Sequence, residues 1–92
     1  MLFENVIKIL DKSKKDNVDL IVARGMLASE ENIPYKELKP ASDFIKAHYD
    51  TITKCRRLGD NDTIKALVEA YESNNIETAN SIIEEVKDRV EE

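Results

Sequence analysis

The chain has 92 residues, of which 41% are hydrophobic and 36% are charged, and its formal net charge is -5 at pH 7. This length allows one hydrophobic core, and the apolar content argues against intrinsic disorder. The longest apolar run is far shorter than the roughly 20 residues of a membrane-spanning helix, and Glu4 does not suit a secretory signal. We therefore expect a single helical domain over residues 1–92 with no membrane role, and the single cysteine, Cys55, fits the reducing cytoplasm.

The first half of the sequence predicts two helices and a short helical turn. Apolar residues repeat every three to four positions over residues 2–15, which is typical of an amphipathic helix. A second helix is predicted over 17–30, and between Val18 and Ala28 its apolar residues fall on every side. Such a helix has to be enclosed, so we expect it at the centre of the bundle, where Gly25 would let a neighbour approach closely. A proline at the start of residues 34–38 favours a short helix there.

The second half predicts three longer helices. The first covers residues 42–58, with Ser42 as its N-cap and Gly59 as its C-terminal stop. The other two, over 62–73 and 76–90, are separated by turn residues and form a helix hairpin. The last helix has a narrow apolar seam that would pack on the helix before it, formed by Ile76, Ala79, Ile83, Val86 and Val90. The expected fold is an all-α compact bundle of four to five helices with a C-terminal hairpin.

Residues 27–41 have the spacing of a DNA-binding motif. The slots for a small residue, a turn residue and two apolar residues are filled by Ala28, Asn32, Ile33 and Leu38. The stretch therefore resembles a helix-turn-helix, which implies a recognition helix that reads base edges. Two residues depart from the pattern, since Glu31 takes an apolar slot and Pro40 shortens the recognition helix to about one turn.

A nucleic-acid site would combine this stretch with the basic face of the helix over 42–58. Residues 34–59 carry a net charge of +3, although the sequence pI is about 4.9. The candidate residues are Tyr35, Lys36, Lys39, Lys46, Lys54, Arg56 and Arg57. Because phosphate contacts release counterions, binding through these side chains would weaken steeply with salt.

The last third of the chain is acidic, with a net charge of -7 over residues 60–92. Carboxylates at the C-terminal end of a helix oppose the helix dipole, so this end should fray unless a basic group holds it. The candidate face for a basic partner consists of Glu84, Glu85, Asp88 and Glu91.

No residue pattern indicates catalysis. His48 and Cys55 are the only residues of their kinds, and seven positions on one helix separate them by about 10 Å along the axis, too far for a nucleophile and its base. The sequence has no phosphate-binding loop and no metal-ligand spacing, so we expect no enzyme, cofactor or metal. The preferred hypothesis is a non-enzymatic protein-protein interaction or regulatory module that acts through amphipathic helix faces. Its partner is another protein or a second copy of the chain, and the alternative is a nucleic-acid-binding regulator.

Overall fold

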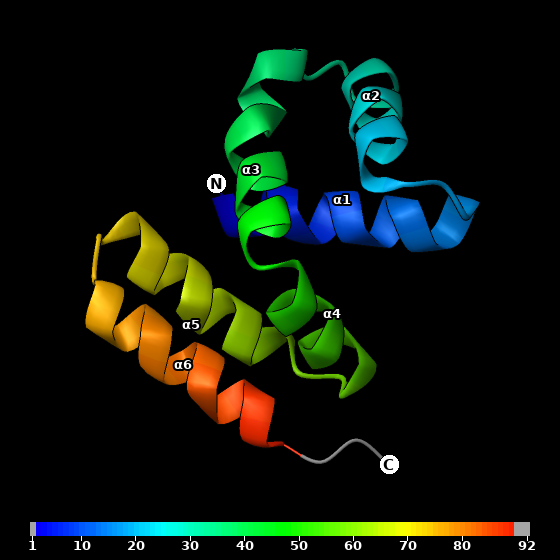
Figure 1. Cartoon of the computed structure of the whole chain (residues 1–92). Coiled ribbons are helices and arrows are strands. Elements are labelled where there is room, and N and C mark those ends of the chain that lie inside the picture. Colours follow the sequence, from blue (N-terminus) through cyan, green and yellow to red (C-terminus); the bar gives the residue numbers. More distant parts are fainter. Residues whose placement is uncertain (1, 90–92) are drawn as a thin grey trace. The chain divides into compact units, whose positions relative to one another are not determined.

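The computed structural model describes residues 2–89, and this range consists of helices and turns (Figure 1). The helices are α1 (Leu2–Asp16), α2 (Leu20–Glu30), the 3₁₀ turn η1 (Tyr35–Leu38), α3 (Lys39–Ala47), α4 (Tyr49–Arg57), α5 (Asn61–Glu72) and α6 (Ile76–Asp88). The all-α prediction is confirmed, but the described range holds six α-helices rather than four to five. None of these helices has both the length and the apolar character needed to span a bilayer. The chain groups into two compact units, unit 1 (residues 1–47) and unit 2 (residues 48–92), and the single domain over 1–92 stays a prediction.

In unit 1, α1 lies across α2 and α3 and contacts both of them (Figure 1). The amphipathic pattern of α1 is confirmed, because its buried residues are the apolar Val6, Ile9 and Leu10, while Glu4 and Asp11 on the opposite side are exposed. The fully or nearly fully buried apolar residues of this unit are Val6, Ile9, Leu10, Ala23, Leu27, Leu38, Ala41, Phe44 and Ile45. This core holds α2 and η1 in place at the surface of the unit.

The predicted helix over 42–58 is two helices that divide at His48. This residue has φ -125° and ψ 31°, outside the helical region, and its carbonyl accepts the first hydrogen bond of α4 from the Ile52 N–H. The first of the two helices also begins earlier than predicted, at Lys39, so Ser42 is a buried residue within α3 rather than its N-cap. Pro40 is tolerated because N–H groups in the first turn have no partner within a helix. No glycine or proline stands at this break. The apolar residues repeat at helical spacing on both sides of His48, and the sequence therefore predicted one continuous helix.

The prediction of an enclosed central helix is wrong. Helix α2 starts at Leu20, after Asp19 caps it by accepting a hydrogen bond from the Val22 N–H at 3.1 Å. Only Ala23 and Leu27 of this helix are buried. The expected close approach at Gly25 is also absent among the described residues, because a Cβ placed there would meet no atom within 4 Å. The sequence shows how apolar a helix is, but not how many neighbours cover it.

The two glycines allow a matched stability test. We expect Gly25→Ala to stabilise the protein by up to about 1 kcal/mol, since alanine is the better helix former and the position is open. Gly59 has φ +71°, so Gly59→Ala should destabilise by roughly 1 kcal/mol because an L side chain strains this conformation. Urea unfolding of the two variants beside the wild type measures both effects. Destabilisation of the monomeric chain by Gly25→Ala would contradict the open environment of this residue.

In unit 2, α5 and α6 lie side by side as the predicted antiparallel hairpin (Figure 1). Asn74 takes a left-handed conformation in the turn, and Asn75 caps α6 by accepting a hydrogen bond from the Thr78 N–H. Along the predicted seam of α6, Val86 is buried, Ala79 and Ile83 are half-buried, Ile76 is exposed and Val90 lies outside the described residues. The seam is therefore closed toward the end of α6 and open beside the turn.

Candidate interaction surfaces

Helix α2 presents an uncovered apolar face, formed by Ile21, Val22 and Gly25, which we call the α2 surface. The three residues lie within about 100° of the helix circumference at about 100° per residue. The side chains of Ile21 and Val22 are 58% and 46% exposed. Because nothing stands within 4 Å of a Cβ at Gly25, another helix could approach the backbone there.

An arginine anchors the flank of the α2 surface. The guanidinium of Arg24 lies 3.8 Å from the centroid of the Tyr35 ring. It also donates hydrogen bonds from Nε and Nη2 to the Tyr35 carbonyl, at 3.3 and 3.0 Å. Stacking and hydrogen bonding together hold η1 against α2. The flank of the α2 surface is therefore fixed in position.

Ion pairs balance the charges of unit 1. Lys12 lies 2.7 Å from Glu30 and 2.9 Å from Asp16, and the hydrogen bonds that its ammonium donates to these carboxylates raise its pKa. Lys8 pairs with Glu31 at 3.0 Å. Residues 1–47 contain eight acidic and eight basic residues, so unit 1 has no formal net charge.

Unit 2 contains a groove of about 510 Å³ at the turn end of the α5–α6 hairpin, which we call the hairpin groove. Its apolar lining comes from Ala70, Tyr71, Ile76 and Ala79, and its polar lining includes Glu72 and three asparagines. The side chains of Tyr71 and Ile76 are 48% and 67% exposed. The His48 ring also lines the groove and meets the Tyr71 ring edge to face, with centroids 6.2 Å apart. Burial lowers the pKa of His48, which keeps the imidazole neutral near pH 7.

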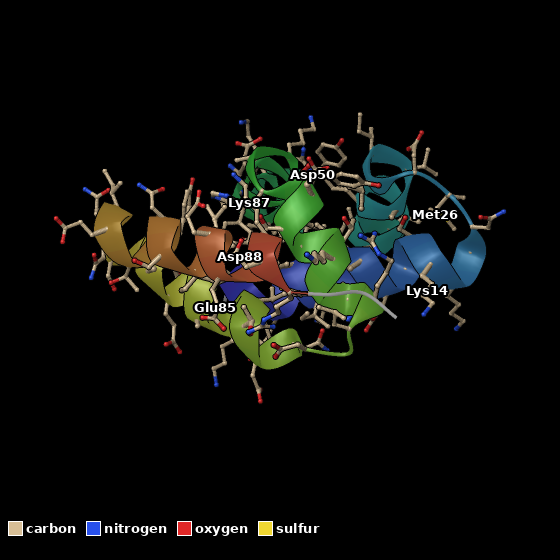
Figure 2. All side chains as sticks on the ribbon, turned by 60° about the horizontal axis from the view of Figure 1, so that its bottom comes forward. Lys14, Met26, Asp50, Glu85, Lys87 and Asp88 are labelled. Atoms are coloured by element: carbon tan, nitrogen blue, oxygen red, sulfur yellow. The ribbon has the colours of Figure 1, made fainter. Side chains whose placement is uncertain are left out.

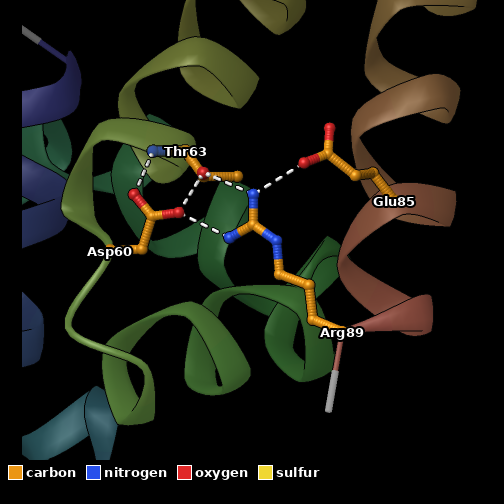
Figure 3. A network of polar contacts seen from close by, with 4 residues as sticks. All are labelled: Asp60, Thr63, Glu85 and Arg89. Carbon is orange, nitrogen blue, oxygen red and sulfur yellow. Dashed lines mark hydrogen bonds and ion pairs between the residues drawn. The ribbon is translucent and has the colours of Figure 1, made fainter.

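At the other end of the hairpin, Asp60, Thr63, Glu85 and Arg89 form one polar network (Figure 3). Asp60 caps α5 by accepting a hydrogen bond from the Thr63 N–H at 3.1 Å, and it also accepts from the Thr63 hydroxyl. Arg89 donates to Asp60, to the Thr63 hydroxyl oxygen at 3.3 Å and to Glu85 at 2.7 Å. The network joins the end of α6 to the start of α5, so Arg89 is a basic group that holds this acidic helix end.

Comparisons with protein families, with curated proteins and with solved structures found no match to this chain. The proposal below therefore rests on the exposed residues, charges and contacts of these surfaces.

The Asp60 network predicts a pH-dependent contribution to stability. Hydrogen bonds from Thr63, followed by those from Arg89, lower the pKa of Asp60. Its contribution is present above the unfolded pKa of about 3.9 and is lost as pH falls through the lower folded value. At pH 7 we expect Asp60→Ala to cost about 1–2 kcal/mol, and Asp60→Asn to cost less because asparagine also caps helices. Urea unfolding at pH 7 and pH 3 measures this, and an Asp60→Ala effect that is equally large at both pH values would contradict the assignment.

The predicted acidic face is partly engaged within the chain. Figure 2 shows Glu85, Lys87 and Asp88 on the last turns of α6. Glu85 belongs to the Arg89 network, and Glu84 lies 3.5 Å from Lys87. Asp88 is exposed, and Glu91 lies outside the described residues. Binding of a basic partner by these four residues stays a prediction.

The predicted nucleic-acid residues divide between the two units. In unit 1, Arg24 stacks on Tyr35, and Lys39 pairs with Asp43 at 2.6 Å, while Lys36 and Lys46 are exposed on η1 and α3. The hydrogen bond from Lys39 lowers the pKa of Asp43. Two of the four unit 1 candidates thus already have partners within the chain.

The other three candidates lie on α4 in unit 2. Lys54 donates to the Lys87 carbonyl at 3.1 Å, and Arg56 donates to the Asn61 side chain at 3.2 Å. Arg57 is exposed. The break at His48 means that Lys46 and these three residues do not share one helix, and nucleic-acid binding stays a prediction.

The cysteine is placed for packing. Cys55 is a free thiol that is 1% exposed, and burial raises its pKa. A thiol that stays protonated is a poor nucleophile. No group of three or more His, Cys, Asp or Glu side chains within residues 2–89 could hold a metal ion.

Sequence reasoning missed both apolar surfaces and the role of Arg89. A signal for the α2 surface was present, because a helix that is apolar all round needs more neighbours than a short chain supplies. A signal for the hairpin groove was also present, since Ile76 stands at the first position of α6, directly after the turn.

Proposed function

We propose that this chain is a non-enzymatic protein-protein interaction or regulatory module in which the α2 surface pairs two copies of the chain. The observation that carries the proposal is the exposure of Ile21 and Val22 beside an open Gly25. Covering such aliphatic side chains is favourable by about 25 cal/mol per Å² of apolar surface. A partner helix would also cover the apolar side of α2 that the chain itself leaves exposed, as expected for a helix with apolar residues on every side.

Charge favours a second copy as the occupant of the α2 surface. Its three residues carry no charge, and unit 1 as a whole has none. Two copies of unit 1 therefore meet without net charge repulsion between them, since the formal charge of -5 belongs to unit 2. A two-fold axis places the same apolar patch on both sides, so one self-complementary surface is sufficient.

Sedimentation equilibrium of the full chain from micromolar to millimolar concentration tests the pairing. We expect a reversible monomer-dimer equilibrium that changes little between low and high salt, because apolar contact is not screened. A strictly monomeric chain throughout this range would overturn the proposal. Dissociation by salt alone would also overturn it, since that would indicate pairing through charged residues.

A further inference from the structure

We propose that the hairpin groove binds a short amphipathic segment of a partner protein, in which apolar anchor residues alternate with lysine or arginine. This site goes beyond the pairing of two copies, because it lies in unit 2 and shares no residue with the α2 surface.

The size and lining of the hairpin groove suit apolar side chains. Its volume of about 510 Å³ falls within the range of ligand pockets, about 300–1,000 Å³. Tyr71 from α5 and Ile76 from α6 stand on either side of the turn, and Ala70 and Ala79 leave room between them. An amphipathic segment that binds a groove inserts its apolar residues and leaves its polar side at the rim. Leucine or an aromatic residue of the partner is therefore the expected anchor.

The charges around the hairpin groove select a cationic segment. Around the turn end of the hairpin, residues 66–80 contain three glutamates and no lysine or arginine, and one of the glutamates, Glu72, lines the groove. His48 also lines the groove, and burial lowers its pKa, so the imidazole adds no positive charge near pH 7. Lysine or arginine on both sides of the partner's anchor would meet this negative field.

Three bases of unit 2 are held by contacts at the other end of the hairpin, away from this groove. Lys54 binds the Lys87 carbonyl near the end of α6, Arg56 binds Asn61 at the start of α5, and Arg89 belongs to the Asp60 network. A second hairpin groove is an unsuitable occupant, since two acidic surfaces repel each other.

Two synthetic peptides of 14 residues test the proposal against the full chain. Both have the same helical pattern of leucines, and the positions between them are lysine in one peptide and glutamate in the other. We expect the leucine-lysine peptide to bind at least tenfold more tightly and to shift backbone amide resonances of ¹⁵N-labelled protein around residues 70–80. Equal affinity for the two peptides, or shifts centred outside residue 48 and residues 70–80, would overturn the proposal.

A matched pair of exposed isoleucines separates groove binding from general attraction to an acidic protein. Ile76→Ser removes an apolar side chain from the groove without changing the charge, and it should weaken the leucine-lysine peptide about tenfold. Ile21→Ser makes the same change on the α2 surface and should leave peptide affinity unchanged. An unchanged affinity of the Ile76→Ser chain would overturn the groove assignment. Because the peptide affinity is read separately from sedimentation, failure of the pairing proposal leaves this test intact.

Discussion

Ile21→Glu should raise the dissociation constant of the paired chains by more than about a hundredfold and leave a monomer at micromolar concentration. The substitution removes the most exposed aliphatic side chain of the α2 surface and places a carboxylate there. Loss of one isoleucine that becomes buried between the paired chains costs about 1.5 kcal/mol or more. In a dimer with a two-fold axis the substitution occurs twice in the interface. The total of about 3 kcal/mol corresponds to more than a hundredfold in affinity.

The control for this substitution is Ile76→Glu, which makes the same change at a more exposed isoleucine in the hairpin groove. We expect that chain to pair as the wild type does, since Ile76 lies in unit 2. Helical circular dichroism should be the same for both variants, because each side chain is more than half exposed. Pairing that survives Ile21→Glu, or that both glutamates abolish equally, would contradict the assignment of the α2 surface.

Phe44→Ala should lower the free energy of unfolding by about 3–5 kcal/mol, the usual cost of deleting a buried aromatic side chain. Phe44 on α3 is 0% exposed and is the largest of the fully buried side chains in residues 2–89. The cost has two physical parts, the lost transfer of the ring out of water and the cavity that remains. Urea unfolding at fixed protein concentration gives the difference, since pairing makes stability depend on concentration.

The control for Phe44→Ala is Tyr49→Ala, which removes an aromatic side chain that is 51% exposed and should cost much less. Hydrogen exchange of the Phe44→Ala chain also tests the predicted single domain. In one cooperative domain, the slowest amides of α1 and of α5 lose the same protection. Unchanged protection in α5 would show that unit 2 unfolds independently. Equal effects of the two alanines would contradict the buried position of Phe44.

The candidate surfaces could be predicted only in part, because composition and exposure are separate properties. The basic residues were predicted as nucleic-acid contacts from their charge alone. In the structure, Lys54 and Arg56 donate hydrogen bonds to Lys87 and Asn61 within the chain. Ile76 was predicted as part of a packed seam, and it lies at the open end of the hairpin instead. Whether a charged side chain forms a hydrogen bond within the chain depends on residues that are distant in sequence. A local sequence pattern therefore could not predict these contacts.

The sequence by itself determined the all-α class, the amphipathic pattern of α1, the helix stop at Gly59 and the hairpin turn after α5. These features are local, since helix periodicity and turn conformations depend on residues within a few positions. Only the tertiary structure decided the division at His48, the open face of α2 and the contact of Arg89 with Asp60. Each of these depends on which neighbours fill the space around a side chain, and that is settled by packing between segments far apart in the chain.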